Sequence, residues 1–96
     1  MEIIEKLENW YLSQCNGEWE HSSGFSIRTL DNPGWMVTIC LEDTDFEGTE
    51  SWEIESHRSE HDWVVCRLAE NKFEGNGGPQ NLKEILDIFL AWTERI

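Results

Sequence analysis

The spacing of apolar residues changes twice along this chain, and the two changes limit the folds that it can form. Near each end, apolar residues recur every three or four positions, as Ile3, Leu7 and Trp10 do, which is typical of an amphipathic helix. Between the ends they alternate with polar residues, which is typical of strands. An uninterrupted run of strands with a helix at each end predicts an α+β fold rather than a parallel α/β fold.

The helix limits follow from the residues that flank each pattern. Gly17 comes just after the N-terminal pattern and can take the left-handed conformation that ends a helix. Residues 75–79 break the strand pattern and predict a structural turn before the C-terminal helix. Asn81, with Glu84 three positions later, resembles a capping box, and Pro79 is the alternative first helical residue. The apolar face of this helix consists of Leu82, Ile85, Leu86, Phe89 and Trp92.

Period-two alternation begins after Trp19. The clearest hairpin joins residues 25–30 to residues 35–42 through a turn containing Pro33 and Gly34. Further strands are expected at 52–55 and 63–68, with a short fifth at 72–74. We therefore expect a single domain over residues 1–96, in which an antiparallel meander of four to five strands lies between two helices. Both helices are expected on one sheet face, so that the other face is open to a partner.

The charge of the chain favours a cationic partner. Twenty Asp and Glu residues stand against seven Lys and Arg, giving a formal net charge of −13. Nucleic acids and anionic membranes attract clustered cations, so this excess argues against binding to either. Surplus charge also serves solubility alone, and composition does not separate the two explanations.

The cysteines indicate a reduced compartment and no thiol catalysis. Their number is odd, the N-terminus has no signal-peptide pattern, and no apolar stretch approaches the roughly 20 residues that span a bilayer. A cytoplasmic protein is the prediction. Cys15 lies at a helix C-terminus, where the helix dipole disfavours a thiolate, and Cys40 and Cys66 lie within predicted strands. We expect no catalytic cysteine.

Other chemical sites are not expected either. His57 and His61 have a spacing that suits metal binding on a helix, but they flank a predicted turn, and no C-x-x-C pair accompanies them. The glycines of residues 75–79 match neither the P-loop nor the dinucleotide fingerprint. Twenty carboxyl groups do not single out a pair for acid–base work. We therefore predict no catalytic residue, no metal and no cofactor.

One acidic stretch has aromatic residues within it and runs from the end of the hairpin into the third strand. Carboxylates in such a stretch can match Lys and Arg on a partner, while aromatic residues supply apolar anchors. A solvated loop and strand face is the alternative interpretation. The predicted partner-binding residues are Glu42, Asp43, Asp45, Phe46, Glu47, Glu50, Trp52, Glu53 and Glu55.

Six short motifs together resemble the bacterial immunity protein family number fifty-three. They span nearly the whole chain: Trp10–Gly17, Trp19–His21, Thr29–Trp35, Asn71–Gly75, Gly77–Pro79 and Asn81–Leu82. The resemblance implies a protein that neutralises a cognate toxin of a polymorphic, contact-dependent system inside the producing cell. With the acidity of the chain, it suggests a basic toxin domain such as a nuclease. Oligomeric state is not predicted.

Two alternative functions stay open at this point. Some similar sequences carry the label of a rhodanese-related sulfurtransferase, although here no cysteine opens an arginine-lined anion loop. An adaptor that binds a different partner through the same acidic surface is the other alternative.

Overall fold

The computed structural model describes residues 2–22 and 24–95, and over these residues it confirms the predicted α+β class. A helical N-terminal part precedes five strands and a last helix. In chain order the elements are α1 (Ile3–Gln14), α2 (Trp19–Ser22), β1 (Phe25–Leu30), β2 (Gly34–Cys40), β3 (Trp52–Ser59), β4 (Asp62–Ala69), β5 (Lys72–Gly77) and α3 (Leu82–Thr93).

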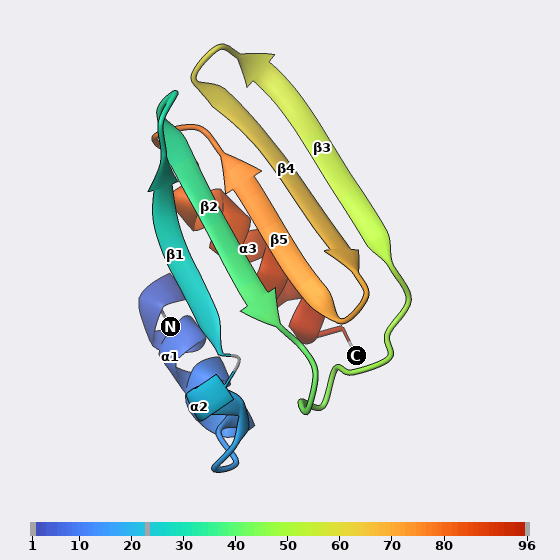
Figure 1. Ribbon diagram of the computed structural model, residues 1–96. Helices are drawn as coiled ribbons and strands as arrows, with labels where there is room; N and C mark the ends of the chain where they lie inside the picture. Colours follow the sequence, from blue (N-terminus) through green and yellow to red (C-terminus); the bar gives the residue numbers. More distant parts are fainter. Residues whose placement is uncertain (1, 23, 96) are drawn as a thin grey trace.

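The strands form one antiparallel sheet in the order β1-β2-β5-β4-β3 (Figure 1). This order departs from the predicted meander at one step, because β5 lies between β2 and β4. Residues 41–51 therefore cross the end of the sheet to join β2 to β3. They are held there by Asn71 in the β4–β5 turn, whose backbone oxygen and side-chain Oδ1 accept hydrogen bonds from the amides of Leu41 and Gly48, each at 2.7 Å.

Helices α1 and α3 lie on the same face of the sheet, as predicted (Figure 1). α3 contacts β5 and β4, and α1 packs beside α3. Among the described residues, no helix lies behind β3, the strand at one edge (Figure 1). The helical layer is thus narrower than the sheet, and the helix-facing side of β3 is left partly uncovered.

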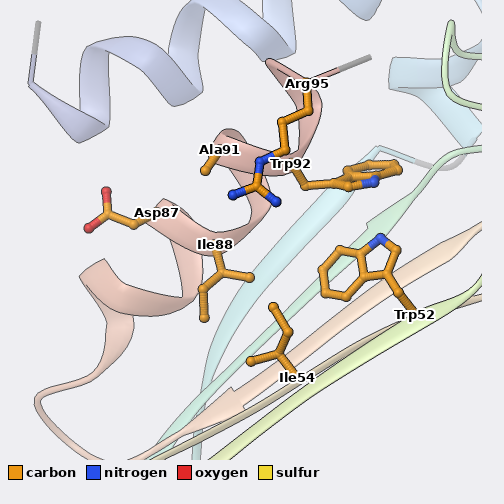
Figure 2. A pocket seen from close by; sticks show the side chains of 7 residues that line it. All are labelled: Trp52, Ile54, Asp87, Ile88, Ala91, Trp92 and Arg95. Carbon is orange, nitrogen blue, oxygen red and sulfur yellow. The ribbon is translucent and has the colours of Figure 1, made fainter.

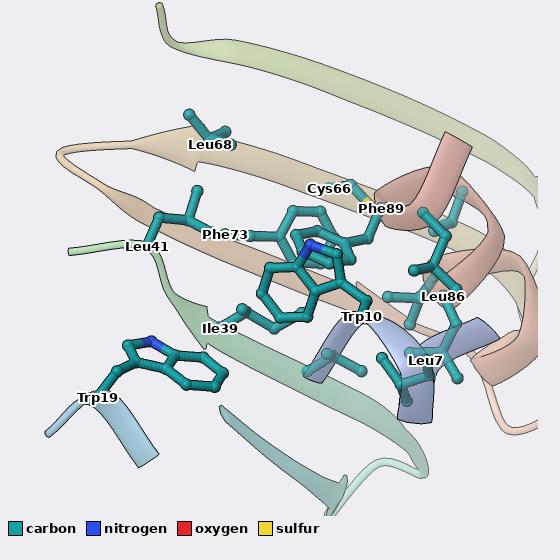
Figure 3. Close-up of a cluster of buried hydrophobic side chains, with 14 residues drawn as sticks. Leu7, Trp10, Trp19, Ile39, Leu41, Cys66, Leu68, Phe73, Leu86 and Phe89 are labelled. Carbon is teal, nitrogen blue, oxygen red and sulfur yellow. The ribbon is translucent and has the colours of Figure 1, made fainter. Parts of the chain in front are cut away.

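The core lies between the helices and the three inner strands, β2, β5 and β4 (Figure 3). Phe89 of α3 is at its centre, with its ring centroid 4.9 Å from both Trp10 of α1 and Phe73 of β5. Burial of aromatic rings dominates such a core, because each removes roughly 150–250 Å² from water. The other core residues are Leu7, Trp19, Val37, Ile39, Leu41, Val64, Cys66, Leu68, Ile85, Leu86 and Leu90.

Residues 19–22 form a short helix, whereas the sequence predicted that strand alternation begins after Trp19. Asn16 explains the difference, since its Oδ1 accepts hydrogen bonds from the backbone amides of Glu18 at 2.9 Å and Trp19 at 3.0 Å. This side chain acts as a cap and starts a helical turn. Trp19 is then fully buried, and its indole N–H donates to the carbonyl of Cys40 at 2.9 Å.

Gly75 and Gly77 belong to strand β5, not to the predicted turn. A Cβ at Gly75 would collide with Cγ2 of Ile85 in α3, and a Cβ at Gly77 would lie 3.0 Å from Cδ1 of the same side chain. The glycines therefore allow α3 to approach the sheet closely, a use of strand glycine that turn chemistry alone does not distinguish.

The predicted capping box is absent. The side chain of Asn81 makes no hydrogen bond to the backbone of α3, which begins at Leu82. Its Nδ2 donates instead to Asp62 at 2.9 Å and to Glu84 at 3.0 Å. Pro79 precedes the helix, and its carbonyl accepts a hydrogen bond from the indole of Trp35 at 2.9 Å.

Candidate functional site

The segment 41–51, called here the acidic connection, is an ordered element. Thr44 Oγ1 donates to the carbonyl of Leu41 at 2.6 Å and accepts from the amide of Phe46 at 3.1 Å. The amide of Asp43 donates to the carboxylate of Glu47 at 2.6 Å. Its exposed carboxylates, carried on this fixed backbone path, are Glu42, Asp43, Asp45, Glu47 and Glu50.

The C-terminal end of α1 holds the acidic connection from the other side. Gln14 is buried, with 7% of its surface exposed; its Oε1 accepts from the amide of Asp45 at 3.1 Å, and its Nε2 lies 3.4 Å from the Asp45 carboxylate. Asn16 Nδ2 donates to the Asp43 carboxylate at 3.0 Å. Carboxylates fixed in this way lose less conformational entropy when a partner binds.

The two aromatic residues of the predicted surface face inward. The ring of Phe46 lies 6.1 Å from Trp10 and 5.4 Å from Trp92, and the ring of Trp52 lies 6.0 Å from Phe73 and 5.8 Å from Trp92. Both are half-buried. They attach the acidic connection and strand β3 to the core.

Glu53 and Glu55 lie on the opposite, open face of the sheet. Both are exposed, and the Glu55 carboxylate is 2.7 Å from Nε2 of His57, whose ring stacks on Trp63. The structure thus divides the nine predicted residues among the acidic connection, the inner side of β3 and its outer side. It does not bring them into one contiguous patch.

An apolar groove between β3 and α3 was not predicted from the sequence (Figure 2). It has a volume of about 490 Å³. Ile54 on its β3 side is 44% exposed. The sequence placed Trp92 on the buried face of a helix. It did not reveal that Ile54 is left uncovered by the helices. The lining residues are Trp52, Ile54, Asp87, Ile88, Ala91, Trp92 and Arg95.

A polar network fixes β3 relative to α3 near the end of the strand. Arg58 donates to Asp62 at 2.9 Å and to Glu84 in the first turn of α3 at 2.5 Å. These hydrogen bonds hold the pKa of both carboxyl groups below their ordinary values, and Asn81 adds to the effect. The same bonds raise the pKa of Arg58. The network links the end of β3 to the first turn of α3, next to the groove.

The geometry around the cysteines does not favour nucleophilic chemistry. Burial raises the pKa of the Cys66 thiol to about 12, so almost no thiolate forms near neutral pH. Cys15 Sγ donates to the carbonyl of Tyr11 at 3.3 Å. Within residues 2–22 and 24–95, no group of three or more His, Cys, Asp or Glu side chains is placed to hold a metal ion. In the same part of the chain no helix has the length and apolarity needed to cross a membrane.

An ordered acidic surface and an apolar groove beside an edge strand are features of a protein that acts through binding. The sequence matches the family Immunity protein 53 over residues 4–94, and the chain belongs to this family. The predicted resemblance is thereby confirmed. Membership implies an immunity protein that binds a cognate toxin. No curated protein and no solved structure shows a significant match to the chain.

Proposed function

We propose that this protein neutralises its cognate toxin by forming a stoichiometric complex with a basic toxin domain in the cytoplasm of the producing cell. The observation that carries the proposal is the acidic connection, in which Gln14 holds Asp45 and Asn16 holds the Asp43 carboxylate. The net charge of −13 gives the whole molecule a negative electrostatic field of the same sign as that of the acidic connection.

Charge contributes to such a complex mainly through the encounter. Complementary charge raises association rates toward about 10⁸–10⁹ M⁻¹s⁻¹ at low salt and disfavours wrong partners. A basic domain would approach a surface on which Asp43 and Asp45 are already in position. Rigid presentation reduces the ordering entropy lost on binding.

The toxin class that this chemistry fits best is a nuclease. A nuclease needs cations to hold the phosphate backbone of its substrate. The carboxylates of the immunity protein compete for the same cations, so the complex excludes the nucleic acid either by covering the active site or by occupying the phosphate-binding surface.

Coexpression with the toxin encoded by the neighbouring gene tests the proposal. Cells that make the toxin alone should die, cells that make both proteins should survive, and the two proteins should copurify in a 1:1 complex. A toxin from a different gene pair is the specificity control and should not be neutralised. Cell death in the presence of soluble, folded immunity protein would refute the proposal.

A further inference from the structure

Strand β3 has a free edge. It is the last strand of the sheet, and within the described residues it pairs with β4 alone. In the part of the chain that the structure describes, its backbone makes no hydrogen bond outside this pairing. An edge strand of eight residues presents a row of unpaired N–H and C=O groups that can pair with another strand.

The free edge runs along the apolar groove. Trp52 and Ile54 point from β3 into the groove, toward Ile88 and Trp92 of α3 (Figure 2). Successive side chains of a strand point to opposite faces. If a further strand paired with β3, every second side chain would therefore lie over the groove. Apolar residues fit those positions.

The other face of the same edge is acidic. Glu53 and Glu55 are exposed there, and the acidic connection leads into the start of the strand. Directly opposed side chains on neighbouring strands lie about 4.5–5.5 Å apart, where opposite charges attract. The intervening side chains of an added strand would therefore be Lys or Arg.

We propose that the toxin docks by adding an extended segment, in which apolar and basic residues alternate, to the free edge of β3. Its apolar side chains enter the groove of Trp52, Ile54 and Trp92, and its cations face Glu53 and Glu55. This inference rests on the proposed function and specifies where and how the toxin binds.

Two other arrangements fit the charges less well. A second copy of this chain would place its own Glu53 and Glu55 on the same face as the first pair, between two molecules of net charge −13. The opposite edge of the sheet, β1, has Ser26 and Arg28 on its open face and is not among the groove residues. A basic strand therefore fits β3 better than β1.

Amide hydrogen exchange of the unmodified protein, with and without the toxin domain encoded by the neighbouring gene, measures strand addition directly. Outward-facing amides of β3 should exchange at least about tenfold more slowly in the complex, because each gains a hydrogen-bond partner. Amides of β1 are the internal control and should not change.

A second experiment fills the groove with a larger side chain and measures toxin affinity. Ala91 is exposed on α3 and lines the groove, so Ala91→Trp adds bulk there without entering the core. The expected loss of toxin affinity is about 30-fold, the size expected for blocking a central apolar contact. Leu12→Trp is the matched control: Leu12 is 71% exposed on α1 and is not among the groove residues, so toxin affinity should not change.

The outcomes separate this inference from the proposed function. If the toxin binds while the β3 amides stay unprotected, or if Ala91→Trp binds it with full affinity, the proposed docking site is wrong. The proposed function still stands in either case. Protection of β3 in the absence of toxin, together with a doubled molecular mass, shows that a second copy occupies the edge and also overturns the docking site. If the unmodified protein binds no toxin, both proposals fall.

Discussion

Ile85 of α3 packs directly against the backbone of Gly75 in β5, at a point where any Cβ would collide with its Cγ2. Ile85 is fully buried by this contact. The close approach determines how deeply α3 lies on the sheet. It thereby also positions Ile88 and Trp92, which form the helical wall of the groove.

Replacing Gly75 with alanine should destabilise the fold, because the added methyl group meets Ile85 and the ring of Phe73. Overpacking of this kind costs about 1–3 kcal/mol. Urea unfolding of Gly75→Ala, Ile85→Ala and the double variant measures it. The double variant should be destabilised by less than the sum of the two single changes, since truncating Ile85 makes room for the methyl group. Strict additivity would contradict the described contact.

The Arg58 network should make stability depend on pH. The folded-state pKa values of Asp62 and Glu84 lie below their ordinary values, so the unfolded chain binds more protons as the carboxyl groups titrate. The stabilisation is therefore complete above about pH 5 and is lost as pH falls below about 4, through the folded-state pKa values. Thermal unfolding of Arg58→Gln should begin at lower temperature than that of the unmodified protein at pH 7.

The informative quantity is the difference in unfolding temperature between Arg58→Gln and the unmodified protein. The stability of either protein alone is less informative, because protonation also relieves general carboxylate repulsion in so acidic a chain. The difference should shrink as the pH is lowered from 5 to about 3. Arg67→Gln removes the same charge from an exposed arginine on the open face and should show a smaller difference at pH 7. A difference for Arg58→Gln that does not change with pH would argue against the network.

Thiol reactivity distinguishes the immunity function from the sulfurtransferase alternative. With a pKa of about 12 and no exposed surface, Cys66 should react with a thiol reagent at pH 8 about a thousandfold more slowly than an ordinary thiol. Cys15 and Cys40, which are only half-buried, should react first. Mass spectrometry of modified peptides measures the order. Sulfur transfer from thiosulfate that disappears when any one cysteine is changed to serine would favour the enzyme instead.

Salt should slow association with the toxin. Raising the ionic strength from about 0.02 to about 0.5 M should reduce the association rate by roughly tenfold or more, while the dissociation rate changes less. Stopped-flow mixing measures both rates. Glu42→Gln with Glu50→Gln should slow association more than Glu5→Gln with Glu8→Gln, an equal charge change on α1. A rate independent of salt would exclude charge steering.

Much of the fold followed from local patterns. The spacing around Leu7 and Trp10 predicted α1, the turn at Pro33 and Gly34 predicted the first hairpin, and the structure contains both. The predictions failed at residues 19–22 and at residues 75–77. In the first segment a side-chain cap from Asn16 outweighed the alternation. In the second segment, the glycines lie in a strand and allow a helix to pack closely against it. A glycine-rich stretch has the same composition whether it forms a turn or such a strand.

The candidate site was predictable only in its charge. The acidic connection and its exposed carboxylates follow from composition and from the scarcity of apolar residues between 42 and 51, where Phe46 is the exception. That Phe46 and Trp52 face the core depends on Trp92, forty residues or more further along the chain. The groove depends on the same long-range packing.

Spacing of three, four or two residues encodes which segments become helices and strands, because those periods are properties of the local backbone. Net charge is likewise a property of the sequence alone. The insertion of β5 between β2 and β4, the close contact of Gly75 with Ile85 and the uncovered side of β3 required the tertiary structure. Each of them depends on which distant segments pack together, and local periodicity carries no information about that choice.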